Sequence, residues 1–404
     1  MLGLAAAIVY VPDAADPALA ARPVAGRSLA LRAVMAATRA GATAVGVPRE
    51  LARGRLAAEL ARVPAATRTV RWLEAGADAD PVFTDAPCLL VPVSTLVPPA
   101  TLRALLARGS EGEGAVLEGT AARGAPVVAV APGPVQKLWD RLAMGEAVGE
   151  ELTRHVESVA FVTMPAAGAS VEVGDGGARA AEDALFRAMG TDGDTGVDRF
   201  LHRRVSRALT SLLVRTPVTP NQVSLASLAL GLAAAWALWH ATAASAAAGV
   251  VLYALASIVD HSDGELARLT FRESRLGAHL DWLVDTVIHA SLVLAMAVTA
   301  GGPVLAGVGV AAASGVTLSA LLARKLPREI EVGPSLGGAL RHMGNRDLFY
   351  AVLLVFVALR GAVPSLLPAL AVLVATGSQC YWLACLAHLR RAHGAEAGRA
   401  GHPA

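Results

Sequence analysis

The chain has 404 residues, of which 54% are hydrophobic, 4% are aromatic and 17% are charged, and its mean hydropathy is +0.52. Soluble chains carry about 25% charged residues, so this composition argues against a protein that is soluble throughout and excludes disorder. A formal net charge of +2 is too small for a nucleic-acid partner held by bulk charge. The three scattered cysteines suit neither a disulfide framework nor a zinc site.

Residues 1–190 alternate short apolar runs with helical stretches rich in Ala, Arg and Glu. Alternation of this kind predicts an α/β domain with a mostly parallel sheet. Its opening, Met1–Val11, lacks the basic start of a signal peptide. Expected helices include Leu29–Ala40 and Thr101–Arg108. The expected strands are Ala5–Val11, Ala42–Val47, Thr69–Leu73, Cys88–Val93, Val127–Ala131 and Val159–Thr163.

The excess of apolar residues lies in three long runs further along the chain. Gln222–Val259 and Thr286–Ala323 contain no Asp, Glu, Lys or Arg, and Leu348–Leu389 contains only Arg360. Each run is about twice the 20 residues that one membrane crossing needs. They predict an all-α domain of six transmembrane helices over 217–392, and a flexible tail at 393–404. The expected spans are 222–241, 244–262, 281–300, 303–323, 347–360 and 364–388.

The charges between these spans predict the orientation. Basic residues gather before the first span, in two alternate loops and after the last span, whereas the opposite loops contain only Arg360. Both termini should therefore be cytoplasmic, in an integral protein of the inner or plasma membrane. Residues 191–216 predict a linker and then an amphipathic helix, Val197–Arg215, that lies in the membrane interface. A helix packed on the surface of the first domain is the alternative.

Four carboxylates stand together at the predicted cytoplasmic ends of the second and third spans. Asp260 and Asp263 are three residues apart and Asp281 and Asp285 are four apart, so each pair shares one helix face. A short turn can bring the pairs together, where their repulsion favours bound cations. Oxygen ligands favour Mg²⁺, Mn²⁺ or Ca²⁺. The alternative is a solvated charged turn, which fits four carboxylates beside a membrane poorly.

Small and basic residues accompany the carboxylates. Gly264 and Ala267 leave room for a ligand, Gly277 allows a close approach, and Arg268 can pair with a phosphate oxygen. The whole segment resembles the signature of the CDP-alcohol phosphotransferase (phosphatidyltransferase) family. Every fixed position of that signature is present, as Asp260-x2-Asp263-Gly264-x2-Ala267-Arg268-x8-Gly277-x3-Asp281-x3-Asp285.

The resemblance implies a six-helix membrane enzyme that moves a phosphoalcohol group from a CDP-alcohol to an acceptor hydroxyl and releases CMP. It implies that Mg²⁺ or Mn²⁺, as two ions, is held by Asp260, Asp263, Asp281 and Asp285. Asp285 would also be the general base, which is the catalytic role, and the protein would be a homodimer. The implied nucleotide-binding residues are Thr219, Pro220, Asn221, Gly264, Ala267, Arg268 and Gly277. Thr219 and Pro220 equally suit an ordinary helix start.

The sequence indicates the acceptor-binding residues less clearly than the metal and nucleotide sites. Basic residues after the fourth span could bind an acceptor phosphate, although membrane topology alone predicts basic residues there. They are Arg324, Lys325, Arg328, Arg341 and Arg346. Asn345-Arg346-Asp347 resembles a segment of the inositol-handling branch of the family. Phospholipid synthesis and polyol phosphodiester synthesis both remain open.

The first domain weakly resembles the cytidylyltransferase domain that precedes the membrane unit in some synthases of inositol phosphodiesters. The likeness rests on Ala21–Pro48 and on the junction at Glu182–Asn221. The glycine-rich basic loop expected after the first strand is missing, because Pro12-Asp13 stands there without a nearby glycine. Val93-Ser94 replaces the expected metal-binding Asp. These losses predict an inactive structural or regulatory domain.

Two alternatives remain open. A bifunctional enzyme would use the first domain to make its own CDP-alcohol, such as CDP-inositol. A membrane transporter or scaffold would bind ions at the carboxylates without chemistry. It would more naturally place charges near the middle of the membrane and show repeat symmetry, and no repeat is evident in the sequence.

Overall fold

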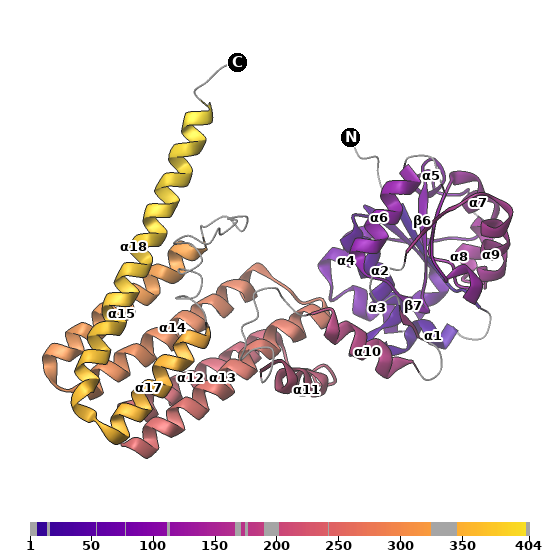
Figure 1. The fold of residues 1–404 in the computed structure, drawn as a ribbon. Coiled ribbons are helices and arrows are strands. Elements are labelled where there is room, and N and C mark those ends of the chain that lie inside the picture. The colour runs from indigo at the N-terminus through magenta and orange to yellow at the C-terminus, as the bar shows by residue number, and fades with distance from the viewer. Residues whose placement is uncertain are drawn as a thin grey trace. The chain divides into compact units, whose positions relative to one another are not determined.

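The computed structural model describes residues 6–13, 17–53, 55–76, 78–110, 114–165, 171–173, 177–189, 202–240, 242–324 and 346–400. The chain forms two compact units. Unit 1 comprises Met1–Gly190 and Leu269–Phe271, and unit 2 comprises Thr191–Arg268 and Arg272–Ala404. Figure 1 shows that the strands belong to unit 1 and the long helices to unit 2.

Unit 1 is built on a sheet that has seven strands in the described part of the chain. They are β1 (Ala6–Tyr10), β4 (Ala44–Pro48), β5 (Val70–Leu73), β6 (Cys88–Pro92), β8 (Ala115–Leu117), β9 (Val128–Val130) and β10 (Val162–Met164). Their order is β10-β8-β9-β6-β1-β4-β5. All neighbours pair in parallel except β9, which is antiparallel to β6 and β8. The mostly parallel sheet expected from the sequence is confirmed.

Two short antiparallel ladders flank this sheet. They join β2 (Pro23–Val24) to β3 (Arg27–Ser28) and β7 (Thr95–Leu96) to β11 (Val171–Glu172). The turn between β2 and β3 contains Ala25 at φ 43° and Gly26 at φ 74°, which are left-handed backbone conformations.

Helices cover both faces of the large sheet (Figure 1). The helices of unit 1 in the described part of the chain are α1 (Pro17–Ala21), α2 (Leu29–Ala40), η1 (Arg49–Arg53), α3 (Arg55–Leu60), α4 (Pro64–Thr69), α5 (Pro81–Thr84), α6 (Pro99–Ser110), η2 (Ala121–Arg123), α7 (Pro132–Lys137), α8 (Trp139–Met144), α9 (Gly149–Ser158) and α10 (Ala178–Arg187). Side chains alternate along β1, so Ala7 and Val9 pack toward α2 and α6. Ile8 and Tyr10 pack toward α5, α7 and α8 on the other face. This two-layered burial is typical of an α/β domain.

Unit 2 is helical throughout its described residues. Its helices are α11 (Arg203–Leu213), α12 (Pro220–Trp239), α13 (Ala243–Thr270), α14 (Arg275–Ala300), α15 (Gly302–Ala323), α17 (Arg346–Ala362), η4 (Pro364–Leu366) and α18 (Leu367–Ala400). Four of the six expected spans, 244–262, 281–300, 303–323 and 347–360, fall within one of them. The expected span 222–241 ends two residues beyond α12, and the expected span 364–388 begins in η4 and continues in α18. Among the described residues, α12, α13, α14, α15 and α18 are long and apolar enough to cross a membrane. The 17 residues of α17 reach only about 26 Å, slightly less than the ~30 Å hydrocarbon core.

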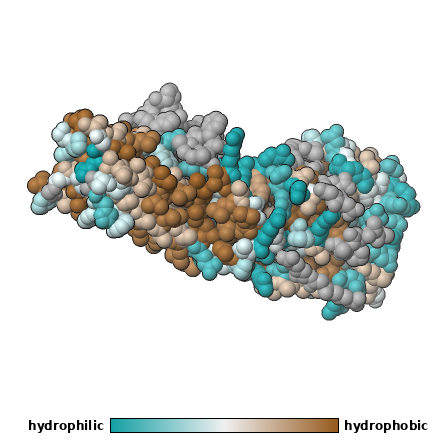
Figure 2. Space-filling view, turned by 90° about the horizontal axis from the view of Figure 1, so that it is seen from below, coloured by the Kyte–Doolittle hydropathy of each residue, from teal (hydrophilic) through white to brown (hydrophobic). Residues whose placement is uncertain are grey.

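Apolar side chains cover the outside of unit 2, as the large apolar surface in Figure 2 shows. Large hydrophobic residues such as Trp236, Val304 and Leu373 are 67%, 81% and 68% exposed. Surface of this extent would be a liability in water and is the normal outer face of helices in lipid. The chain is an integral membrane protein.

The second and third membrane helices are longer than their apolar runs predict. The expected spans end at 262 and begin at 281, whereas α13 continues to Thr270 and α14 already starts at Arg275. No glycine or proline interrupts Glu265–Thr270, which consists mostly of good helix formers, and Ser274 caps α14 by accepting a hydrogen bond from the Gly277 amide at 2.9 Å. Hydropathy marks where apolar residues stop, not where a helix ends. The carboxylates therefore lie inside regular helix.

Helix α14 is the central packing element of unit 2. It packs against α12, α15 and α18. Its contact with α12 depends on Gly231, where an added Cβ would come within 3.0 Å of the Ile288 side chain. A hydroxyl also joins the neighbouring helices, because Ser227 Oγ on α12 donates to the Ala256 carbonyl on α13 at 3.1 Å. Small residues of this kind let membrane helices approach closely.

A pair of matched glycine substitutions tests this packing. Gly231→Ala should lower the free energy of unfolding in detergent by about 1–3 kcal/mol, because the new methyl group displaces Ile288. Gly307→Ala on α15 meets nothing within 4 Å and should leave stability equal or raise it by up to about 1 kcal/mol. Thermal unfolding followed by circular dichroism measures both. Equal midpoints for the two variants would contradict the close α12–α14 contact.

Candidate active site

A cavity of about 380 Å³ opens between one end of α12 and the facing ends of α13 and α14. The turn at 271–274 joins α13 to α14, so the two helices run side by side and present both pairs of carboxylates to the same space. The lining residues are Arg203, Pro220, Asn221, Ser224, Asp260, His261, Asp263, Gly264, Ala267, Arg268, Arg272, Glu273, Ser274, Gly277, Ala278, Asp281 and Asp285. All four aspartates singled out by their spacing thus face one cavity.

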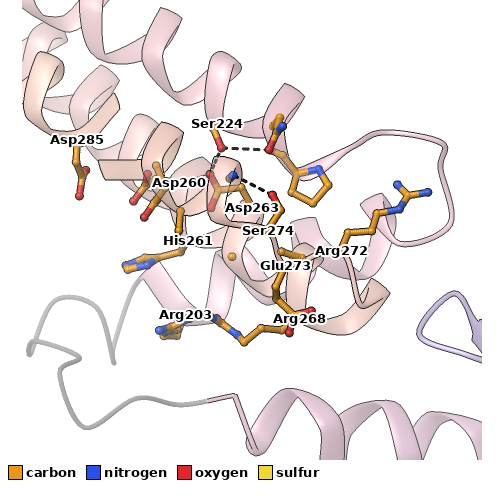
Figure 3. A pocket seen from close by; sticks show the side chains of 17 residues that line it. Arg203, Ser224, Asp260, His261, Asp263, Arg268, Arg272, Glu273, Ser274 and Asp285 are labelled. Atoms are coloured by element: carbon orange, nitrogen blue, oxygen red, sulfur yellow. Dashed lines mark hydrogen bonds between the residues drawn. The ribbon is translucent and has the colours of Figure 1, made fainter. Parts of the chain in front are cut away.

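Three of the four aspartates form a compact group. Each of Asp260, Asp263 and Asp281 offers a carboxylate oxygen, and these oxygens all lie within 4.8 Å of one another. Asp260 and Asp263 are buried, and the hydroxyl of Ser224 on α12 donates a hydrogen bond to Asp263 Oδ2. Asp285 lies one turn further along α14, outside this group, and Figure 3 shows it apart from Asp260 and Asp263.

The start of α12 forms one wall of the cavity. Thr219 and Gln222 make a capping box, in which the Thr219 amide donates to Gln222 Oε1 at 2.9 Å and the Gln222 amide donates to Thr219 Oγ1 at 3.4 Å. Pro220 occupies the first turn. Pro220 and Asn221 line the cavity, whereas Thr219 does not. Of the implied nucleotide-binding residues at the start of α12, Thr219 is the helix cap, whereas Pro220 and Asn221 face the cavity.

The small residues keep the cavity open. Gly264 and Ala267 lie on the face of α13 that carries the aspartates, and both line the cavity beside Arg268. Gly277 has no spare room, because an added Cβ would lie 3.1 Å from Ser274 Oγ and 3.4 Å from Asn221 Oδ1. A side chain at Gly277 would therefore disturb both the cap of α14 and the α12 wall.

A buried ion pair lies on another face of α13. Glu265 is completely buried, and its carboxylate accepts hydrogen bonds from Arg203 Nη1 at 3.0 Å, Ser206 Oγ at 3.1 Å and Thr210 Oγ1 at 2.8 Å. These three donors lie on α11, and Arg203 also lines the cavity. These three donor side chains are buried, while Val205 and Leu212 of the same helix are 43% and 65% exposed. An apolar face turned outward suits the expected position in the membrane interface.

A series of contacting histidine and tyrosine side chains begins at the backbone of Asp285. His289 Nδ1 lies 2.6 Å from the Asp285 carbonyl oxygen, and its Nε2 lies 2.9 Å from the Tyr253 hydroxyl. Because the carbonyl can only accept, Nδ1 carries the proton and Tyr253 donates to Nε2. Tyr253 also contacts Tyr350, whose hydroxyl lies 3.0 Å from Nε2 of the buried His202. These contacts join α11, α13, α14 and α17.

The structure describes two of the five predicted acceptor-binding residues, Arg324 and Arg346. Arg324 follows α15 and does not line the cavity, since its guanidinium stacks 4.8 Å from the centre of the Trp282 ring. Arg346 is the first residue of α17. Lys325, Arg328 and Arg341 lie outside the described residues.

Residues 217–377 match the family model of CDP-alcohol phosphatidyltransferase. The match covers the four aspartates, all the cavity-lining residues except Arg203, and most of the membrane helices. Unit 2 contains a CDP-alcohol phosphatidyltransferase domain. The family assignment made from the spacing of the aspartates is therefore confirmed.

Several relatives resemble part of this chain, and each is named a bifunctional IPC transferase and DIPP synthase. The protein of Thermococcus kodakarensis is 39% identical over 105 residues, which are 26% of this chain and 23% of the relative. That of Rubrobacter xylanophilus is 36% identical over 133 residues, 33% of this chain and 29% of the relative. That of Archaeoglobus fulgidus is 26% identical over 185 residues, 45% of this chain and 36% of the relative. The matches span about a quarter to a third of each relative's length.

Three features of the phosphatidyltransferase domain were missed in the sequence. Ser224 lies in an uncharged run, and Arg203 was expected only as one of the arginines largely opposite the apolar side of the expected interfacial helix, without a carboxylate partner. Glu265 lies two residues after Asp263 and so points to a different helix face. The signal was available, because Arg203, Ser206 and Thr210 recur at a helical spacing that suits a carboxylate partner.

Replacement of Glu265 tests the buried pair. Glu265→Ala should lower the free energy of unfolding by about 3–5 kcal/mol, because it leaves the Arg203 charge buried without its partner. The double variant Arg203→Met, Glu265→Met should cost less than the single one, since no unpaired charge remains. Urea or thermal unfolding in detergent gives both values. A loss below about 1 kcal/mol for Glu265→Ala would show that the pair is solvated, as exposed pairs are.

Proposed function

We propose that the protein is a divalent-metal-dependent transferase that moves a phosphoalcohol group from a CDP-alcohol to an acceptor hydroxyl and releases CMP. The observation that carries the proposal is the group formed by Asp260, Asp263 and Asp281 at the wall of the cavity. The family match to residues 217–377 supplies the reaction class. The relatives' printed name supports a product of the inositol phosphodiester type.

The donor set suits Mg²⁺ or Mn²⁺. Oxygen atoms from three carboxylates within 4.8 Å of one another fit a hard divalent cation, and their mutual repulsion makes a bound cation favourable. Asp260, Asp263 and Asp281 would hold such an ion, and Asp285 lies near enough along α14 to contribute to a second one. A bound ion of this kind supplies charge neutralisation for the pyrophosphate and for the departing CMP.

The remaining cavity residues then have defined tasks. Arg268 lines the same space and offers a guanidinium to a phosphate oxygen, which it can bind in a fork. Asn221 and Gly277 form the wall against which the nucleotide would lie. Asp285, set apart from the other three, would take the proton from the acceptor hydroxyl. The cavity volume of about 380 Å³ is within the range of small-molecule sites.

The charges of the loops support an orientation of the protein in the membrane, and the family resemblance supports a homodimer. Basic residues flank the same ends of α13 and α14 at which the cavity opens, so both termini and the active site would be cytoplasmic. The protein would act as a homodimer in contact with membrane lipid. The transporter alternative is less favourable, because the cavity lies at the ends of the helices and carries the complete family signature.

Unit 1 would be structural or regulatory. The loop after β1 has no glycine, and Ser94, which follows β6, is buried. Arg32 belongs to the stretch that resembles a cytidylyltransferase, but its guanidinium donates to the Val24 carbonyl at 2.8 Å and to the Ala25 carbonyl at 3.0 Å. Burial and the neighbouring Arg27 lower the pKa of Arg32 to about 9. This cation is committed to a strained turn and is not available to a triphosphate.

The first functional prediction concerns Asp285. With Mg²⁺ or Mn²⁺ present, purified protein should release CMP from a CDP-alcohol and an acceptor, and a chelator should abolish the release. Asp285→Asn should reduce the rate by about 10²–10⁴-fold, the usual contribution of a general base. Chromatographic measurement of CMP during a screen of CDP-diacylglycerol and CDP-inositol against polyol and polyol-phosphate acceptors checks it.

The matched control is Asp183→Asn, the same change at an exposed residue of unit 1. It should keep the full rate, and both variants should unfold at the wild-type temperature. Full activity of a folded Asp285→Asn protein would remove Asp285 from its assigned role.

The second functional prediction concerns unit 1. The full chain incubated with CTP, Mg²⁺ and a series of sugar or polyol phosphates should release no pyrophosphate above background. The reason is that the phosphate-binding loop and the metal-binding Asp of the cytidylyltransferase pattern are replaced. A coupled pyrophosphate assay with an active cytidylyltransferase as positive control measures this. Substrate-dependent release would instead establish the bifunctional alternative.

A further inference from the structure

A second cavity of about 520 Å³ lies among α14, α15, α17 and α18. On α14 its wall includes Trp282, Asp285, His289 and Val293, which share one helix face. From Trp282 to Val293 the helix rises roughly 16 Å, at 1.5 Å per residue, or about half of a hydrocarbon core. The cavity therefore extends well into the depth of the membrane.

The wall of this cavity is apolar in effect. Most lining side chains are aliphatic or aromatic. Several of the polar ones donate their hydroxyl hydrogen bonds to backbone carbonyls of their own helices. Thr286 donates to the Trp282 carbonyl, Ser319 to the Gly315 carbonyl and Ser378 to the Ala375 carbonyl. The His289 ring is held by Tyr253 and by the Asp285 carbonyl. Such a wall suits a hydrocarbon chain better than a hydrated polyol.

Asp285 joins this cavity to the carboxylate cavity. Among the described residues, it is the one residue that lines both. It is also the one carboxylate that the described part of the chain contributes to the wall of the apolar cavity. A molecule that lay in the apolar cavity with its polar end at Asp285 would present that end to the phosphates bound beside Asp260 and Asp263.

We propose that the apolar cavity binds the acceptor and that the acceptor is a lipid alcohol, with its free hydroxyl at Asp285 and its chain along α14. This inference rests on the proposed function and narrows it from acceptors in general to amphiphilic ones. It differs from the expectation of a phosphorylated acceptor at Arg324 and the basic residues after it. The Arg324 guanidinium instead stacks on Trp282 at the rim of the cavity.

The reaction balances with this placement. The acceptor hydroxyl gives its proton to the Asp285 carboxylate, and its oxygen forms a bond to the phosphorus that carries the donor alcohol. The bond between this phosphorus and the oxygen that bridges to CMP breaks, and CMP leaves with the electron pair. The product is a phosphodiester that joins the donor alcohol to the lipid acceptor.

Gly377 on α18 offers a direct test, because it lines the cavity and an added Cβ there meets nothing within 4 Å. Gly377→Leu should fill the cavity without a clash in the helix backbone. The matched control is Gly307→Leu, since Gly307 also meets nothing within 4 Å but lines neither cavity. The probe is 1,2-dioleoylglycerol in detergent micelles, and its binding to full-length protein is measured by native mass spectrometry.

The wild type and Gly307→Leu should bind the probe equally, and Gly377→Leu should bind it at least tenfold more weakly. Binding of CMP with Mn²⁺, measured in parallel, should be equal in all three and shows that the first cavity is intact. If Gly377→Leu loses CMP binding as well, Gly377→Ala replaces it, with a smaller loss expected. Failure of the wild type to bind dioleoylglycerol, or equal binding by all variants, would overturn the proposal.

The same proteins separate this proposal from the proposed function. Wild-type protein is given a water-soluble CDP-alcohol with either dioleoylglycerol or inositol phosphate as acceptor. CMP release that requires dioleoylglycerol supports the lipid acceptor, whereas release only with inositol phosphate overturns it and leaves the transferase activity standing. Absence of CMP release with every donor and acceptor refutes the transferase itself, while the binding measurement still decides what the cavity holds.

Discussion

The structure of unit 2 depends on holding three carboxylates together at the edge of a membrane. At separations of at most 4.8 Å, like charges repel by roughly 3 kcal/mol or more per pair at an effective dielectric constant of ~20. The fold accepts this cost because α13 and α14 are locked by the turn between them and by the packing of α14 on its neighbours. Ser224 on α12 relieves part of it by donating to Asp263. The site is therefore built to receive positive charge.

Helix α13 carries acidic residues on more than one face. Asp260 and Asp263 face the cavity, whereas Glu265 is neutralised by Arg203 from α11. That ion pair fixes α11 against the helix that carries the carboxylates, with its apolar residues turned outward. Arg203 reaches the cavity wall at the same time. A displacement of α11 would therefore move Arg203 in the cavity wall.

The sequence predicts the features of the structure that depend on one strong local requirement, such as apolar length or helical spacing. The six helices follow from apolar length, the sheet of unit 1 follows from alternation of strands and helices, and the aspartate cluster follows from helical spacing. The features that the sequence did not predict have a weak local pattern or depend on residues far apart in the chain. The strand Ala115–Leu117 is too short to show a period, and Ser224 lies in a featureless run. The second cavity depends on the packing of four helices, which no local pattern records.

Asp285 lies apart from the other three carboxylates, a difference in position that helical spacing alone does not predict. A group that holds an ion must converge with the others, as Asp260, Asp263 and Asp281 do. A base must instead lie where the acceptor oxygen arrives, on the side of the phosphates away from the nucleotide. Asp285 lies between the polar cavity and the apolar one, and His289 fixes the helix turn on which it stands. This position suits the role of base proposed for Asp285, and its apolar neighbours are the residues proposed to hold the acceptor.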